Sequence, residues 1–342
     1  MTGFNLSGTK NPMRIELDLE RALFEFRDAE IHAKNTPVFF THELTVERIG
    51  IEARLDKVLN WWRSDDVWAP RERKNNSGVK CPFCPVLGNR ERVFEFEDFI
   101  SSDKITSKYA IIINNKWVFP NHFLVIADER NPHPPHKISR ERIHLLCALA
   151  ERLPSFMLYL TGRGMGVPQH FHGHLVKSEY HPPLVKAHFG GQHFKSLWKD
   201  KIACVSEIRY HPWTIETHKY VAGWAVTGPM MNIAEIVIKV AQTCTDLIYQ
   251  NKDKMQTDIF WAPQLNPSED IPVRTVFVFP RRGDGGKSKE TLGATEFVGL
   301  FAFNNKQYFD YSVSNAIADL REAGLPWEES LKGKISEKIS KW

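Results

Sequence analysis

Residues 164–182 read GMGVPQHFHGHLVKSEYHP, and three histidines occupy every second position there: His170, His172 and His174. Alternate residues of a β-strand point to the same face of a sheet, so an extended chain would place these imidazoles side by side. Three titratable rings on one face favour a functional site over incidental packing. Two chemistries fit: a metal ion bound by all three rings, or a nucleophilic imidazole whose neighbours fix its tautomer and stabilise charge.

The segment directly before the histidines is rich in glycine. It reads TGRGMGVPQ and contains Gly162, Gly164 and Gly166, whose backbone N–H groups can approach an oxyanion closely because no side chain intervenes. Gln169 can add a side-chain donor. These four residues form the predicted phosphate- or nucleotide-binding group, and they favour the nucleophile over the metal face.

A second motif, Cys81-Pro-Phe-Cys84, lies upstream. In a reduced compartment a C-x2-C pair is typical of half a zinc site or of a redox pair. A redox pair normally begins a helix, whereas this pair follows a polar loop and precedes PVLGNRERVF, which favours zinc or two plain buried thiols. Two thiolates need two further ligands to complete a tetrahedron, and histidine is the usual supplement.

The apolar pattern around these motifs predicts a compact α+β unit. KYAIIINNKWVFPNHFLVIAD reads as two buried strands joined by a turn at Asn114–Asn115, and ISRERIHLLCALAERL as a helix capped by Ser139. SFMLYL reads as a strand that leads into the glycine segment. The predicted order is strand, strand, helix, strand, glycine loop and histidine strand.

The second half repeats this order more weakly. THKYVAGWAVTGP (217–229) parallels the strand pair, MNIAEIVIKVAQTCTDLIYQ the helix, and DIFWAPQLNPSEDIPVRTVFVFPRRG the last two strands with their loop. In this alignment Arg274, Val276 and Val278 replace the imidazoles, so we expect two similar halves with one active centre.

The chain divides into four predicted regions. The first region contains helical apolar spacing over Leu17–Lys34, a hairpin with Gly50 near its bend, and a polar linker at 63–80. The regions are an N-terminal extension (1–78), a catalytic half (79–200), a degenerate half (201–322) and a charged C-terminal tail (323–342).

Composition limits the class of protein. The 342 residues include 45 basic and 41 acidic ones, and this near balance argues against nucleic-acid binding but suits a small anionic substrate. No apolar run approaches the roughly 18 residues that cross a membrane, and the N-terminal residues lack a secretory core. The five cysteines cannot all pair, and Cys147, Cys204 and Cys244 stand alone in apolar surroundings. We therefore expect reduced thiols, a cytoplasmic location and no membrane partner.

HFHGHLV resembles the histidine-triad signature, His-x-His-x-His followed by apolar residues, and its Gly173 is similar to the glycine of His-Pro-His-Gly-Gln in galactose-1-phosphate uridylyltransferases. INNKWVFPNHFLVIAD resembles the strand–turn–strand of that superfamily, and VRTVFVFPRRG the second-half strand of its phosphorylases. The C-x2-C pair and the degenerate copy are similar to its long double-domain branch, which includes the uridylyltransferases, diadenosine tetraphosphate phosphorylases and GDP-hexose phosphorylases. The resemblance covers 79–310 and implies two histidine-triad-like (HIT-like) halves, each an antiparallel sheet with helices.

The resemblance implies that His172 is the nucleophile. It would attack the α-phosphorus of a nucleoside diphosphate sugar or dinucleoside polyphosphate, forming a nucleotidyl-histidine that phosphate or a sugar phosphate then accepts. The resemblance also implies a structural zinc ion, magnesium with the nucleotide, and a homodimer. The implied zinc ligands are Cys81, Cys84, His170 and His133, with His136 and then His122 as weaker choices for the last.

His174 departs from the pattern of the branch. Its transferases and phosphorylases mostly carry glutamine at this position, whereas the hydrolases carry histidine, which can relay a proton or activate water. A hydrolase that releases a nucleoside monophosphate is therefore the alternative function. A zinc-stabilised nucleotide-binding module without turnover is a further one.

Overall fold

The fold is known from a computed structural model, which describes residues 19–29, 45–49, 55–59, 81, 83–89, 93–96, 103–114, 119, 121–128, 138–162, 170–177, 181–189, 194–209, 221–248, 257–264, 273–282, 292–303, 313–325 and 330–342. Among these residues no helix has both the length and the apolar character needed to cross a bilayer. The elements are β1 (Thr45–Ile49), β2 (Leu55–Leu59), α2 (Cys84–Gly88), β3 (Tyr109–Ile113), β4 (His122–Ala127), α3 (Arg140–Arg152), β5 (Phe156–Leu160), β6 (His172–Lys177), α4 (Pro183–Phe189), β7 (Phe194–Lys199), β8 (Cys204–Ile208), β9 (Trp224–Pro229), α5 (Met230–Ile248), β10 (Thr257–Trp261), β11 (Val273–Pro280), α6 (Ala294–Phe297), β12 (Leu300–Phe303), α7 (Val313–Ala323) and α8 (Ser330–Ser340).

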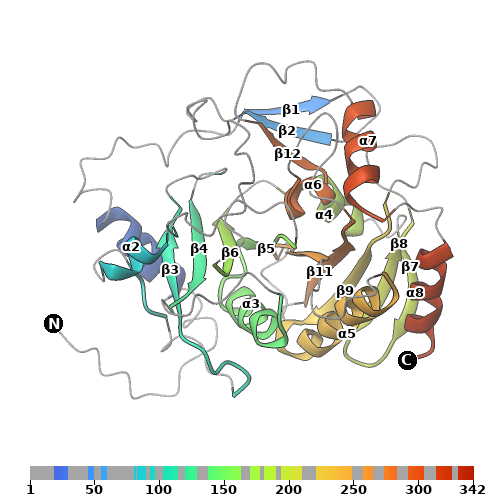
Figure 1. The fold of residues 1–342 in the computed structure, drawn as a ribbon, viewed down its shortest axis with the longest axis horizontal. Coiled ribbons are helices and arrows are strands. Elements are labelled where there is room, and N and C mark those ends of the chain that lie inside the picture. The colour runs from blue at the N-terminus through green and yellow to red at the C-terminus, as the bar shows by residue number, and fades with distance from the viewer. Residues whose placement is uncertain are drawn as a thin grey trace.

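A nine-stranded sheet with the order β3-β4-β6-β5-β10-β11-β9-β8-β7 runs through the molecule (Figure 1). Every neighbouring pair in it is antiparallel. From the central pair, β5 and β10, the order repeats outward: β6 matches β11, β4 matches β9, and β3 matches β8. The predicted α+β class and the two similar halves are therefore confirmed.

Helices α3 and α5 pack side by side on one face of this sheet, where the two halves meet (Figure 1). Apolar residues of the two helices, such as Leu146 of α3 and Val237 of α5, belong to one buried core. Strand residues of both halves, such as Leu158 of β5 and Trp261 of β10, belong to the same core. Ser139 caps α3 as predicted, because its hydroxyl accepts the N–H of Arg142 at 3.4 Å.

The opposite face of the sheet is covered in two separate places. Over β5, β10 and β11, a second apolar cluster includes residues of α4, α6, β12 and α7. Over β3 and β4, a third cluster contains Cys81, Phe83 and Leu87. The histidines of β6 lie on this face, between the two covers.

The N-terminal extension contacts both halves. Leu19 and Leu23, in the helical residues 19–29, are fully buried, and Glu20 accepts a hydrogen bond from Ser155 at 2.7 Å and pairs with Lys177 of the first half. The predicted hairpin is formed by β1 and β2, and β2 pairs in parallel with β12 (Figure 1). The predicted linker at 63–80 lies outside the described residues.

Two strand boundaries differ from the prediction. The link between β3 and β4 continues from Asn114 to Asn121, whose φ of 52° marks the turn into β4, so it is longer than a two-residue turn. Within 217–229 the one described strand is β9, which pairs with β8, earlier in the chain, and with β11. β7 pairs with β8, so the second half of the sheet begins before residue 201.

The segment 323–342, predicted as a charged tail, contains the helix α8, which is partly buried. Ile335 and Ile339 of α8 are fully buried, and α8 packs against α5 and β7. Ser336 of this helix donates to the buried Glu207 of β8 at 2.7 Å, and Lys332 forms an ion pair with the same carboxylate. The many charged residues favoured the prediction of a tail, although Ile335 and Ile339 are spaced four residues apart, as on one face of a helix.

The side chains of Arg274, Val276 and Val278 do not lie where the imidazoles lie. Residues paired across neighbouring strands share a face of the sheet. His174 of β6 is paired with Tyr159 of β5, Tyr159 with Phe260 of β10, and Phe260 with Phe277 of β11. Phe277 therefore shares the histidine face, whereas Val276 and Val278 belong to the helix-covered core. The predicted alignment is wrong by one residue, which exchanges the two faces.

Arg274 has a structural role on the helix-covered face. Its guanidinium is buried and lies at the C-terminal end of α3, where a cation complements the helix dipole and donates to carbonyl groups that have no partner within the helix. The carbonyl groups that accept its hydrogen bonds are those of Ala150, Leu153 (3.2 Å), Phe156 (2.7 Å) and Ala262 (2.9 Å and 2.7 Å). Arg274 thus connects the second half to the end of α3 and the start of β5.

Arg274→Met should lower the free energy of unfolding by about 3 kcal/mol, because several buried carbonyl groups lose their donor. The matched control is Arg140→Met, which removes an exposed ion pair to Glu235 between the same two halves and should cost less than about 1 kcal/mol. Urea unfolding measures both. Equal losses in the two variants would contradict this role.

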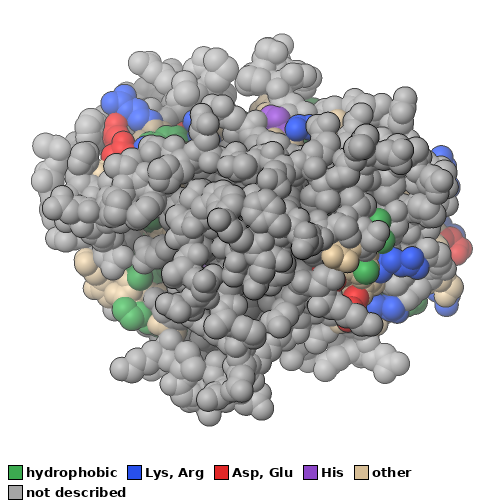
Figure 2. All heavy atoms as spheres, turned by 90° about the horizontal axis from the view of Figure 1, so that it is seen from above, with side chains coloured by type: hydrophobic (Ala, Val, Ile, Leu, Met, Phe, Trp, Pro, Cys, Tyr) green, Lys and Arg blue, Asp and Glu red, His purple; other side chains and the backbone are tan. Residues whose placement is uncertain are grey.

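The described side chains visible on the face in Figure 2 carry charges of both signs in small separate groups. This distribution agrees with the near balance of basic and acidic residues in the sequence.

Candidate active site

The histidine strand β6 lies between β4 and β5 and is buried on both faces. His172 and His174 point away from α3, and Gly173 between them faces that helix. A Cβ atom on Gly173 would lie 3.0 Å from Val125 Cγ1 and 3.3 Å from Leu146 Cδ2. The glycine therefore lets the sheet and α3 approach closely while the imidazoles occupy the other face.

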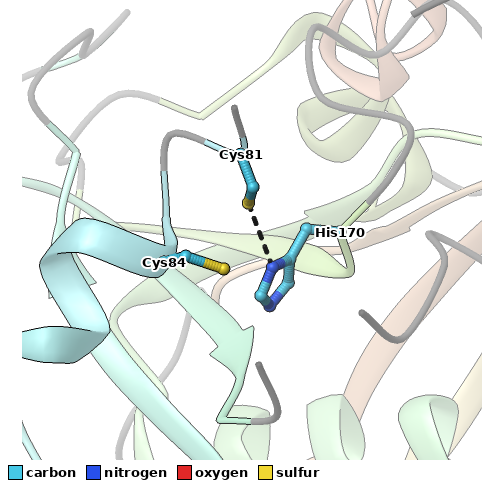
Figure 3. Close-up of side chains that lie close together, drawn as sticks. All are labelled: Cys81, Cys84 and His170. Atoms are coloured by element: carbon cyan, nitrogen blue, oxygen red, sulfur yellow. Dashed lines mark hydrogen bonds between the residues drawn. The ribbon is translucent and has the colours of Figure 1, made fainter. Parts of the chain in front are cut away.

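His170, just before β6, lies beside the two cysteines (Figure 3). Its Nδ1 is 3.3 Å from Cys81 Sγ, and the three potential ligand atoms of Cys81, Cys84 and His170 all lie within 4.8 Å of one another. Its Nε2 donates to the carbonyl oxygen of Ala127 at 2.8 Å, so in this tautomer the lone pair of Nδ1 faces the thiols. This donor set, with a carbonyl group that orients the imidazole, fits a zinc ion.

One detail of the cysteine motif differs from the prediction, because Cys84 does begin a short helix, α2. In a thioredoxin-like pair the two cysteines react with each other. Here the imidazole of His170 lies beside both thiols and makes a three-residue cluster with them. The candidate fourth ligands, His133 and His136, lie outside the described residues.

His172 is buried, and its Nδ1 donates to the carbonyl oxygen of His170 at 3.1 Å. This bond selects the tautomer whose lone pair is on Nε2. Burial lowers the pKa of His172 to about 4, so the imidazole is neutral at neutral pH. The ring lies against Phe83, with the centroids 5.3 Å apart. A neutral imidazole held in one tautomer is the form that acts as a nucleophile.

His174 contacts the side chains of Tyr159 and His122. Its ring stacks on Tyr159 with centroids 4.3 Å apart and an interplanar angle of 6°, and its Nδ1 lies 2.8 Å from Nε2 of His122. His122 is fully buried, and the side-chain nitrogen of Asn114 lies 3.3 Å from its ring nitrogens. The rings of His172 and His174 are 5.3 Å apart.

His122 belongs to this site, although the sequence suggested at most a weak metal ligand. It contacts His174, so it forms part of the histidine cluster and not of the cysteine cluster. Alternation in β4 places His122 on the same face as Leu124, the cross-strand partner of His174, and this was the signal that could have found it.

Two predicted arrangements are not observed. The three histidines do not converge on one point, because His170 contacts Cys81 whereas His174 contacts His122. The N–H of Gly162 donates to Asp258 Oδ1 at 2.7 Å, so it is not directed at a phosphate as predicted. The other residues predicted to bind phosphate, which are Gly164, Gly166 and Gln169, lie outside the described residues.

The sheet is built from two similar halves, and comparison with solved structures shows that known proteins share this fold. The chain is similar to yeast Ap4A phosphorylase Apa2 in complex with AMP (TM-score 0.57, 11% identity, 90% of this chain and 96% of that chain). It is also similar to Apa2 in complex with Ap4A (TM-score 0.56, 11% identity, 90% and 98%). No known family pattern and no curated protein sequence matches the chain. At this identity the likeness shows the fold alone.

Gly173→Ala should lower the free energy of unfolding by about 1–2 kcal/mol, because the new methyl group overpacks the contact between β6 and α3. Gly333→Ala is the matched control. Nothing lies within 4 Å of a Cβ at Gly333, which is in α8, so that change should be neutral or stabilise by up to about 1 kcal/mol. Urea unfolding distinguishes the two, and a Gly173→Ala variant as stable as the wild type would contradict the close packing.

Proposed function

We propose that this protein is a nucleotidyl-transfer enzyme, a phosphorylase or nucleotidylyltransferase that acts on a dinucleoside polyphosphate or a nucleoside diphosphate sugar. The observation that carries the proposal is a pair of neighbouring imidazoles, the buried His172 in a single tautomer and the half-buried His174 beside it. The fold is shared with a phosphorylase solved with Ap4A and with AMP, which supports a nucleotide as the substrate.

The proposed reaction has two displacements. Nε2 of His172 attacks the α-phosphorus, a phosphorus–nitrogen bond forms, and the bond from phosphorus to the leaving oxygen breaks. His174 lies on the same face and donates a proton to that oxygen. Phosphate or a sugar phosphate then attacks the same phosphorus and gives its proton to His174. The phosphorus–nitrogen bond breaks, and both histidines return to their starting forms.

Hydrolysis is the second candidate, and the bond between His174 and His122 supports it. Nδ1 of His174 and Nε2 of His122 are 2.8 Å apart, so a proton can pass between the two imidazoles. Activation of a water molecule requires such a proton transfer. In that case water replaces phosphate in the second displacement, and the product is a nucleoside monophosphate. Glutamine at position 174 could hold the phosphoryl group but could not relay the proton.

A structural zinc ion is part of the proposal. Cys81, Cys84 and His170 supply three ligands of the right chemistry, and His133 is the proposed fourth, with His136 as the alternative. When bound, the ion would join the segment that begins α2 to the residue that precedes β6. The segment also carries Phe83, which contacts the rings of His170 and His172, so metal binding would hold the nucleophile in place.

The function is tested with Ap4A and a panel of nucleotide sugars, with and without phosphate, by identifying the released products. His172→Asn should lower kcat by about a thousandfold or more, because the covalent route is lost. If the wild type uses water as the acceptor, His174→Gln should shift the products of the second step from hydrolysis to phosphorolysis. His144→Gln is the matched control, since His144 is buried in α3 and bonded to Glu235, away from the cluster, and it should keep full activity.

Substrate binding without any turnover by the wild type would contradict the proposal and favour a binding module. Full activity in His172→Asn would contradict the assignment of the nucleophile.

Metal analysis tests the zinc site. The wild type should hold about one zinc ion per chain, and cobalt substitution should give a thiolate-to-metal absorption band. Both should be lost in Cys81→Ser and Cys84→Ser but retained in His172→Ala. Cys147→Ser is the matched control. Cys147 is also a buried thiol, but it accepts a hydrogen bond from the indole N–H of Trp261 and is not part of the cluster. Unchanged zinc content in Cys84→Ser, or loss of zinc in His172→Ala, would contradict the site.

A further inference from the structure

A buried ion pair of the second half lies at the end of a strand of the first half. Asp258 of β10 and Arg281, directly after β11, are both fully buried, and Arg281 Nη1 donates to Asp258 Oδ2 at 2.9 Å. The other carboxylate oxygen, Oδ1, accepts the backbone N–H of Gly162 at 2.7 Å. Gly162 follows β5, so one carboxylate joins β10, β11 and β5.

The pair lies on the histidine face of the sheet. Phe260 is opposite Tyr159 and Ile259 is opposite Leu160, so Asp258 shares its face with Phe260 and Tyr159. Tyr159 is in turn the ring on which His174 stacks. Only two residues separate Tyr159 from Gly162 in the chain. A displacement of the end of β5 would therefore reach the His174 ring directly.

A neighbouring segment holds the pair from the other side. Arg281 also donates to the carbonyl oxygen of Leu292 at 2.5 Å, and the N–H of Gly293 donates to Glu296 Oε2 at 2.8 Å. A Cβ atom on Gly293 would lie 3.3 Å from Thr161 Oγ1, so this segment packs closely against the end of β5. Residues of both halves thus fix the point where the chain leaves β5.

The electrostatics agree with an ionised carboxylate. Burial raises the pKa of Asp258 to about 6, although Arg281 and the N–H of Gly162 oppose the rise. At neutral pH the group therefore carries its charge and accepts both bonds. Apolar residues of similar volume often replace a buried ion pair without loss of stability. Stability alone does not explain a carboxylate at this position, whereas the need for a directed oxygen acceptor for the N–H of Gly162 does.

We propose that Asp258 and Arg281 are positioning residues for the active centre in the other half of the chain. They hold the end of β5 through the N–H of Gly162, and so fix the Tyr159 ring against His174. The inference rests on the proposed function for its kinetic consequences, but not for its structural ones. Through these two residues the degenerate half then contributes to the active centre at a distance from the imidazoles.

Two double variants separate positioning from stability. Asp258→Asn/Arg281→Met and Asp258→Leu/Arg281→Met both remove the buried charges, but only the first keeps an oxygen that can accept the Gly162 N–H. The asparagine variant should keep kcat within about threefold of the wild type, whereas the leucine variant should lose at least about tenfold in kcat with KM nearly unchanged. Thermal unfolding confirms that both variants are folded.

Glu207→Gln is the matched control, because Glu207 is another buried carboxylate, paired with Lys332 and Ser336 near the far edge of the sheet. It should lower stability and leave kcat unchanged. Equal kcat values in two folded double variants would overturn the proposal.

A second measurement does not depend on turnover. The side-chain nitrogen chemical shifts of His174 and His122, measured by NMR, should change in the leucine variant and stay near the wild-type values in the asparagine variant. If the wild type proves inactive, the proposed function fails while this measurement still tests the positioning role. Unchanged shifts in the leucine variant would overturn that role.

Discussion

The pairing of β5 with β10 is the interaction on which the rest of the structure depends. It joins two similar halves into one sheet and fixes which side chains of the second half share a face with the histidines. Charged residues of the second half hold both ends of β5: Arg274 donates to the carbonyl oxygen of Phe156, and Asp258 accepts the N–H of Gly162, each at 2.7 Å. β5 is thereby held in register beside β6.

The two halves share a framework but differ in chemistry. On the same face of the sheet, the first half presents His122, His172 and His174, whereas the second presents Phe260 and Phe277 within an apolar cluster. The same face of the sheet is therefore polar in the first half and apolar in the second, and the described part of the chain contains one histidine cluster. The second half then supports, through β10, the strand β5 that lies next to the histidine strand β6.

The family resemblance implied the cluster of Cys81, Cys84 and His170, and local sequence patterns were enough to predict the histidine strand and the helix capped by Ser139. They failed where the answer depends on tertiary contacts. β11 is apolar on both faces, so no alternation showed whether Val276 or Phe277 replaces an imidazole, and the alignment slipped by one residue. The role of Asp258 depends on a contact with Gly162, 96 residues away, and no local pattern reveals such a partner.

The central claim is that one imidazole in this sheet forms a covalent intermediate. The most direct measurement is the mass of the intact protein and of its peptides after brief reaction with Ap4A without phosphate, quenched in alkali because phosphorus–nitrogen bonds are labile in acid. One nucleotidyl group per chain should appear on the peptide that contains His172 and disappear when phosphate is added. An adduct on another residue, or turnover without any adduct, would contradict the claim.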